Sequence, residues 1–200
     1  MYKISPDGIV SFSLRKIGHE DVETVRRLAD RCVGENLYSA EEISSAIGSS
    51  DRFFHLLQDE HGSAVGYIYY YLTTEEALAE YSKLDGSIFQ VLPYRHGRRV
   101  GKIQSVSVDH EYRGMGLATA MMEFVLEEMG KLSVDAVFIV CWKPQGTIPL
   151  QKALQECGFS FLSVARHVWY DDTRLICPYC RGRCTCDAEV YYKMLKGDEA

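Results

Sequence analysis

The stretch "SVSVDHEYRGMGLATAMM", residues 105–122, passes from the pattern of a strand to that of a helix within a few residues. Two glycines, Gly114 and Gly116, stand at the junction, where they permit a tight turn and a close approach of the backbone to a ligand. A helix that starts here offers backbone amides without intrahelical partners, and its dipole favours an anion such as phosphate. The stretch therefore indicates either a phosphate-binding turn or a tight connection between a strand and a helix.

The segments around this turn predict a mixed α/β domain rather than a regular Rossmann alternation. The predicted order is β-α-α-β-β-β-α-β-α-β-β, with a poorly patterned connection at 73–99 that contains a possible short helix at 75–81. The expected strands are 12–17, two within 52–72 that turn at His61 and Gly62, 100–108, 136–142, 161–170 and 188–195. The expected helices are 22–32, 39–48, 117–131 and 148–158.

Length and composition are those of one globular domain, residues 1–200. Of the 200 residues, 46% are hydrophobic and 25% charged, and the formal net charge is −6. That charge argues against general attraction to nucleic acid or to an anionic membrane surface. The sequence shows neither the apolar core of a signal peptide nor a stretch long enough to cross a membrane. We therefore expect a cytoplasmic protein without a membrane partner.

The run Arg113-Gly114-Met115-Gly116-Leu117-Ala118 matches the pattern Arg/Gln-x-x-Gly-x-Gly/Ala after a central strand. In this the sequence resembles the GNAT superfamily of acyl-CoA-dependent N-acetyltransferases. The resemblance covers about Phe12 to Leu195 and includes "QKALQECGF" at 151–159, which is similar to the family's second cofactor helix with its closing Gly-Phe. It implies a mixed β-sheet flanked by helices, with a β-bulge in the central strand.

The resemblance also implies a co-substrate, acetyl-CoA, and an acceptor, a primary amine. The pyrophosphate of the cofactor would lie on the backbone amides of the turn, and the pantetheine arm would pair with the preceding strand. The bulge would splay this strand from the one at 136–142, and the acetyl thioester would enter the gap. The residues expected to bind the cofactor are Val106, Ser107, Val108, Arg113, Gly114, Met115, Gly116, Leu117, Ala118 and Thr119.

The sequence departs from the family at the position of the residue that usually protonates the departing thiolate. Many members carry a tyrosine four residues before the Gly of the closing Gly-Phe, and this chain has Leu154. A frequent asparagine at the start of that helix is also missing, and Thr147 stands near its place. No catalytic residue is therefore assigned from the sequence. Alternatives that spacing does not separate are Tyr94, His96, Tyr170 and Tyr179.

Four of the seven cysteines form the cluster "CPYCRGRCTC" near the C-terminus. Four thiolates at this spacing predict a closed, structural zinc site. The alternatives are an iron–sulfur centre, which matches neither common ferredoxin spacing, a redox Cys-x-x-Cys, two disulfides, or unligated thiols. The expected zinc ligands are Cys177, Cys180, Cys184 and Cys186. The remaining cysteines, which fall on apolar faces and are expected in the core, are Cys32, Cys141 and Cys157.

The cluster is too small to form a domain, so residues 177–186 are expected to be an insert in the hairpin between the last two strands. In the family this hairpin borders the groove for the acceptor. Zinc would then shape a loop that faces the substrate without taking part in acetyl transfer. Three arginines, Arg174, Arg181 and Arg183, make the loop basic, either as a solvated rim or as a contact for an acidic acceptor or the cofactor phosphates.

Three functions follow from these features. The first is N-acetylation of a primary amine, and the second is an acyl-CoA-binding sensor or scaffold of the same fold, in which Leu154 reflects lost catalysis. The third, a zinc-ribbon-like nucleic-acid binder, is supported by the three arginines and opposed by the net charge. The acceptor remains open among protein N-termini, lysines, polyamines, amino sugars and drugs, and so does homodimer formation.

Overall fold

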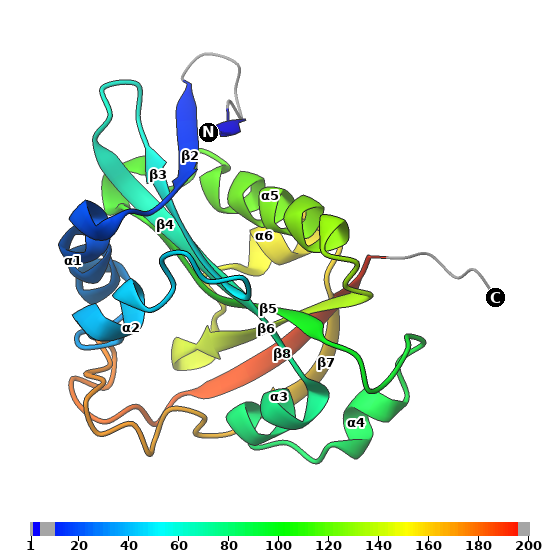
Figure 1. The fold of residues 1–200 in the computed structure, drawn as a ribbon. Coiled ribbons are helices and arrows are strands. Elements are labelled where there is room, and N and C mark those ends of the chain that lie inside the picture. Colours follow the sequence, from blue (N-terminus) through cyan, green and yellow to red (C-terminus); the bar gives the residue numbers. More distant parts are fainter. Residues whose placement is uncertain (1, 5–10, 196–200) are drawn as a thin grey trace.

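A computed structural model describes residues 2–4 and 11–195 as one sheet with helices on both faces (Figure 1). Within these residues the sheet has eight strands in the order β1-β2-β3-β4-β5-β6-β8-β7. Every neighbouring pair is antiparallel except β5 and β6, which are parallel. The strands are β1 (Tyr2–Ile4), β2 (Phe12–Lys16), β3 (Arg52–Gln58), β4 (Ala64–Thr73), β5 (Val100–Val108), β6 (Ala136–Lys143), β7 (Ser160–Ala165) and β8 (Asp187–Met194).

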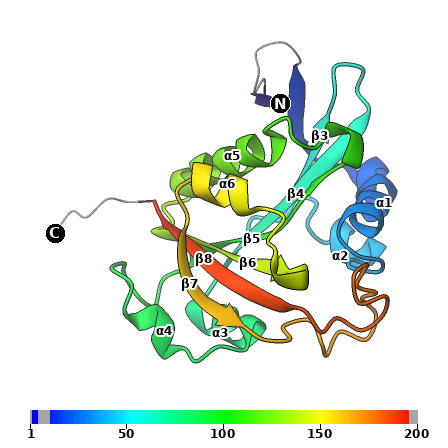
Figure 2. The ribbon, with the colours of Figure 1, turned by 180° about the vertical axis from the view of Figure 1, so that it is seen from behind.

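The helices fall into three groups, each packed on its own part of the sheet (Figures 1 and 2). One apolar cluster joins α5 and α6 to β2–β6, a second joins α1 and α2 to β3 and β4, and a third joins α3 and α4 to β5–β8. The helices are α1 (Val22–Cys32), α2 (Ala40–Ser44), α3 (Glu75–Ser82), α4 (Ser87–Gln90), α5 (Leu117–Lys131) and α6 (Gln151–Glu156).

The central strand β5 carries one extra residue. Tyr69 pairs with Ser105 and the next residue of β4, Tyr70, pairs with Ile103, so Gln104 has no partner across β4. Such a bulge puts two successive side chains on one face of the sheet. Gln104 and Ser105 therefore both point away from α5.

The bulge coincides with the point where β5 and β6 part. Their parallel pairing covers only residues 101–103 of β5 against 137–139 of β6. Beyond Ile103 the edge of β5 that faces β6 has no strand partner among the described residues, while its other edge stays paired with β4 as far as Val108. The predicted bulge and splay are confirmed, and they leave an open backbone edge in the middle of the sheet.

The predicted element order is confirmed, with β1 and α4 as additional short elements. The strand at 100–108 and the helix at 117–131 have the predicted bounds. The expected strand at 161–170 is too long, because it ends at Ala165 and His167 has a φ of 50° that breaks an extended chain. The expected helix at 148–158 begins only at Gln151, since Leu150 takes the N-cap position.

No helix within residues 2–4 and 11–195 is both long and apolar enough to span a bilayer.

Candidate functional site

The backbone of the glycine turn has the tight conformation that its two glycines predicted. Gly114 and Gly116 have φ values of 83° and 76°, in the left-handed region that favours glycine. Gly116 is the N-cap of α5, and the first helical hydrogen bond runs from the Ala120 amide to the Gly116 carbonyl at 3.1 Å. The amides at the start of α5 consequently have no partner inside the helix and can bind an anion.

A groove of about 440 Å³ runs from this turn along β5 to the start of α6. It contains all the residues predicted to bind the cofactor except Met115, whose side chain packs against the core beneath α5. The site residues that line it are Val106, Ser107, Val108, Arg113, Gly114, Gly116, Leu117, Ala118 and Thr119. The structure thus brings the turn and the open edge of β5 together in one cleft.

A second pocket, of about 150 Å³, adjoins the groove on the side of α1 and α3. The two share Cys32, Val106 and Trp142, together with Pro149, Leu150 and Pro178. Its walls are largely apolar, and no charged residue is among the described residues that line it. This pocket begins where β5 leaves β6, because Gln104 and Ser105 of the bulge form part of its wall.

Tyr81 of α3 reaches into the second pocket. Its hydroxyl oxygen accepts hydrogen bonds from Gln104 Nε2 at 3.1 Å and from Trp169 Nε1 at 3.0 Å. Burial raises the pKa of the Tyr81 hydroxyl above its ordinary value, and these two hydrogen bonds offset only part of that rise. No sequence pattern singles out Tyr81, because its two partners lie 23 and 88 residues away along the chain.

The four alternative acids from the sequence lie elsewhere. Tyr94 is packed near β6 with Glu75 beside its hydroxyl, and His96 Nδ1 lies 3.0 Å from a carboxylate oxygen of Glu75. Tyr170 stacks under the guanidinium of Arg183. Tyr179 lines the groove but, like the others, is not among the residues that line the second pocket.

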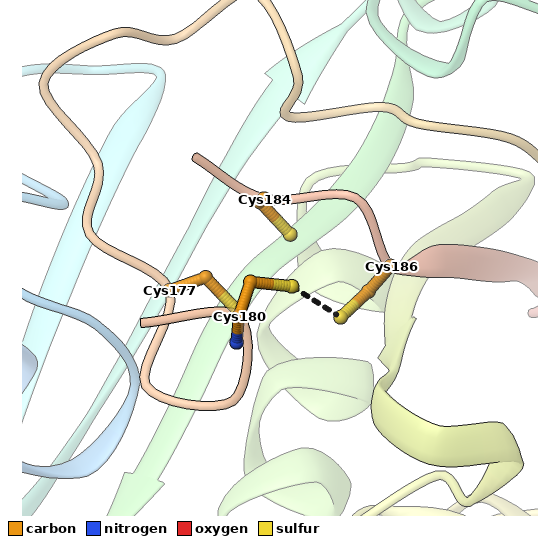
Figure 3. A group of neighbouring side chains, drawn as sticks. All are labelled: Cys177, Cys180, Cys184 and Cys186. Atoms are coloured by element: carbon orange, nitrogen blue, oxygen red, sulfur yellow. Dashed lines mark hydrogen bonds between the residues drawn. The ribbon is translucent and has the colours of Figure 1, made fainter. Parts of the chain in front are cut away.

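The four clustered cysteines come together in the connection between β7 and β8, where the insert was predicted. Their Sγ atoms all lie within 4.8 Å of one another (Figure 3). Four sulfurs around one zinc ion, each about 2.3 Å from it, would lie about 3.8 Å apart in a tetrahedron. The backbone amides of Cys180 and Thr185 donate to Cys177 Sγ and Cys180 Sγ, both at 3.5 Å. The cluster is therefore a candidate metal centre with thiol ligands and amides that stabilise thiolates.

The thiols of this cluster differ in their surroundings. Hydrogen bonds from Thr185 lower the pKa of Cys180 to about 7. Burial raises the pKa of Cys184 to about 11 and also raises the pKa of Cys186, although the indole of Trp142 acts in the opposite direction on Cys186. A metal cation would offset the burial of these sulfurs, because it binds the charged form.

The cysteine cluster forms one wall of the second pocket. Cys177 and Cys184 line the pocket beside Leu175 and Pro178. The segment before the cluster is tied to the end of α1 by a backbone pair between Ile176 and Glu35. A loop far from the glycine turn in sequence thus shapes the pocket next to it.

Two of the remaining cysteines lie in the core as expected, whereas Cys32 does not. Cys141 and Cys157 are buried in the cluster under α5 and α6. Cys32 is half-buried and lines both the groove and the second pocket, because it ends α1 at the rim of the cleft. The prediction that Cys32 lies in the core was wrong.

Intramolecular contacts engage two of the three loop arginines. Arg174 lies 3.6 Å from a carboxylate oxygen of Glu42, and it also pairs with Asp172. Arg183 stacks on Tyr170. These contacts favour the interpretation of the basic residues as a rim that fastens the loop.

A family model described as the acetyltransferase (GNAT) family matches residues 22–159, well over half of the chain. The chain belongs to the GNAT acetyltransferase family. This region contains the bulged strand β5, the glycine turn and α6. No curated protein sequence gave a match.

Solved structures of GNAT enzymes share the fold at low identity. NAA60 of Arabidopsis thaliana, in complex with acetyl-CoA, is 13% identical with a TM-score of 0.66, over 92% of this chain and 99% of that one. The ribosomal-protein-S18-alanine N-acetyltransferase of Escherichia coli is 12% identical with a TM-score of 0.63, over 94% and 98%. The dodecameric spermidine N-acetyltransferase of Vibrio cholerae is 13% identical with a TM-score of 0.59, over 92% and 94%.

Proposed function

We propose that this protein transfers an acetyl group from acetyl-CoA to a primary amine. The observation that carries the proposal is the open edge of β5, which leads from the glycine turn to a second, largely apolar pocket. One end of such a cleft suits the phosphates of a nucleotide-linked cofactor. The other end suits an acceptor that must lose its charge before it reacts.

The residues of β5 and the turn would hold the cofactor by their backbones. The backbone amides from Arg113 to Thr119 would hold the pyrophosphate, because this turn lines the groove at the N-terminus of α5, where the helix dipole attracts phosphate. The unpaired edge from Val106 to Val108 would hydrogen-bond the amides of the pantetheine arm, as an added strand would. The side chains of these valines remain in the core, so binding and packing use different parts of the same residues.

The chemistry follows from the thioester. A neutral amine nitrogen attacks the carbonyl carbon, the C–N bond forms, and the C–S bond breaks with its electron pair on sulfur. The nitrogen loses one proton and the sulfur gains one, so the products are an N-acetylated amine and free CoA. The largely apolar walls of the second pocket disfavour an ammonium group and thus favour the neutral amine that the attack requires, while thiolates at Cys177 and Cys184 would act in the opposite direction.

The proposal is tested by incubating the purified chain with acetyl-CoA and a panel of amines, with free thiol measured as the product. The panel should contain peptides with free N-termini, lysine peptides, polyamines, amino sugars and arylalkylamines. Thiol release that depends on an amine, with the acetylated amine identified by mass spectrometry, supports an enzyme. Tight binding of acetyl-CoA without any product would contradict the enzymatic function and support the sensor function that Leu154 favours.

We also propose that residues 177–186 are a zinc-binding insert within a single domain that spans residues 1–200. The donor set fits the metal, since four thiols within 4.8 Å of one another match a tetrahedral thiolate site. Cys177, Cys180, Cys184 and Cys186 would hold zinc, which would supply cross-linking and no chemistry to the acetyl transfer. The segment itself has few apolar side chains beyond Cys177 and Cys184 to fold by burial, so a metal would supply the missing stabilisation.

A further inference from the structure

We propose that Tyr81 is the proton donor to the departing thiolate, from a position on α3 rather than on the helix before the closing Gly-Phe. This inference rests on the proposed acetyl transfer and names a residue for its last step. The acid would then come from α3, whereas Leu154, which stands where many members of the family carry a tyrosine, is buried in the core under α5 and α6.

The position of Tyr81 is the first support. Tyr81 lines the second pocket beside Gln104, Trp142 and Val106, and the last two of these also line the cofactor groove. The hydroxyl bonds to the bulge residue Gln104, at the point where β5 parts from β6 and the gap for the thioester begins. Of the tyrosines, Tyr81 is among the described residues that line this pocket, whereas Tyr94, Tyr170 and Tyr179 are not.

The hydrogen bonds of Tyr81 are the second support. Its oxygen accepts from both Gln104 Nε2 and Trp169 Nε1, and no hydrogen bond from its own O–H to another described residue is present. A phenol oxygen that accepts two hydrogen bonds still has one proton to give. That proton is left for a group inside the pocket.

The orientation of the Gln104 amide is determined by its other neighbours. Gln104 Oε1 accepts a short hydrogen bond from Lys102 Nζ and a longer one, at 3.4 Å, from the Tyr71 hydroxyl. Because two donors hold the oxygen end, the NH₂ end must face Tyr81. Gln104 is thereby fixed as a donor to Tyr81 and acts as a positioning residue.

The same arrangement stabilises Tyr81 after it has given its proton away. Two N–H groups point at the oxygen on which the phenolate charge would develop. In the buried pocket such bonds act more strongly than in water. Trp169 and Gln104 therefore lower the cost of the charged intermediate without themselves exchanging a proton.

The step balances in protons and electrons. When the C–S bond breaks, its electron pair stays on sulfur, and the Tyr81 O–H proton moves to that sulfur. The Tyr81 oxygen then regains a proton from the acetylated nitrogen, directly or through water, and the phenol is restored. No oxidant, reductant or further reactant takes part.

The experiment compares Tyr81→Phe with the unchanged chain in single-turnover acetylation of the best amine of the panel. We expect the rate to fall about 100-fold, the low end for loss of a general acid. Calorimetry should find the affinity for acetyl-CoA within twofold. Tyr94→Phe is the matched control, since it removes a buried tyrosine hydroxyl from a residue that does not line the pocket. Its rate should stay within twofold.

A change of leaving group separates proton donation from mere positioning. The oxygen-ester analogue of acetyl-CoA expels an alkoxide, which needs a proton far more than a thiolate does. The rate ratio between the unchanged chain and Tyr81→Phe should therefore be at least tenfold larger with the oxygen ester than with the thioester. An equal ratio, or a defect confined to the KM of the amine, would overturn the proposal.

Three further outcomes have defined consequences. If Tyr81→Phe does not fold, Trp169→Phe replaces it, with about a tenfold loss of rate and the same dependence on the leaving group expected. If the unchanged chain acetylates no amine, the proposed function fails and this inference fails with it. An active chain beside an equally active Tyr81→Phe overturns this inference alone.

Discussion

Glu35 and Ile176 exchange two backbone hydrogen bonds, of 3.2 and 3.0 Å, and so join the end of α1 to the segment that leads into the cysteine cluster. Leu37, after α1, packs against Leu175 and the cluster beyond it. The segment after α1 and the segment that leads into the cysteine cluster, which form two walls of the second pocket, are therefore held together. A change in the cluster must reach the acceptor side of the cleft, while the glycine turn lies on another element.

Replacement of Gly116 tests the phosphate end of the cleft. Gly116→Val places a β-branched residue at a φ of 76° and obstructs the backbone approach to a ligand. We expect acetyl-CoA to bind at least tenfold more weakly, which corresponds to about 1.4 kcal/mol. Calorimetry measures this, and Gly130→Ala in the same helix, where a Cβ would meet no atom within 4 Å, is the control. Unchanged affinity in a folded Gly116→Val would argue against this site.

Loss of one cysteine tests the metal site. Cys180→Ser should release zinc, loosen the connection between β7 and β8, and raise the KM for the amine more than it weakens acetyl-CoA binding, because the cluster lines the second pocket. Elemental analysis of untagged protein should find about one zinc per chain, as one four-ligand site requires. Cys180→His, which keeps a zinc ligand, should retain metal. A metal-free chain with full activity would contradict the site.

β4 lies close to β5, which lines the groove, so a substitution on β4 tests the groove through its neighbouring strand. A Cβ on Gly66 would lie 2.3 Å from the carbonyl oxygen of Ser107, so Gly66→Ala must displace the strand that lines the groove. We expect a loss of about 1 to 3 kcal/mol in the free energy of unfolding and weaker binding of acetyl-CoA. Gly86→Ala, with open space around the new Cβ, should change neither. Urea titration and calorimetry measure the two effects.

His55 should make the fold sensitive to acid. Its side chain is 4% exposed, with stacked Tyr70 and the edge of Phe124 beside it, and burial lowers its pKa from 6.5 to about 4. The unfolded chain takes up a proton below pH 6.5 that the folded chain refuses, so stability falls as the pH falls. The loss reaches about 3 kcal/mol by pH 4.

The acid sensitivity is measured by urea unfolding between pH 7 and 4. His55→Leu should remove most of this slope between pH 6.5 and 4, while His61→Gln, at an exposed turn, should leave it in place. If both variants keep the slope of the unchanged chain, another group is responsible.

The elements that could be predicted from the sequence are those whose local pattern and tertiary role agree. β5 and α5 have their predicted bounds. The alternation of apolar residues in β5 and their helical spacing in α5 each extend as far as a glycine or a capping turn. The strand after α6 was predicted too long, since "RHVWY" is apolar enough to continue it and nothing local reveals the turn at His167. Tyr81 was missed for a similar reason, as its role depends on Trp169, which only the fold brings near.

The bulge at Gln104 adds one residue to β5 without turning the neighbouring side chains to the other face of the sheet. Ile103 and Val106 face the same core on either side of it, and Ser105 pairs with Tyr69 as a regular strand would require. A chain that lacked Gln104 would keep Ile103, Ser105 and Val106 on their present faces, but Lys102, which is buried, and Tyr81 would each lose a hydrogen-bond partner. Its β5 could then run on beside β6 and seal the slot. One extra residue thus holds a slot open in the middle of the sheet, and its amide hydrogen-bonds the Lys102 and Tyr81 side chains beside that slot.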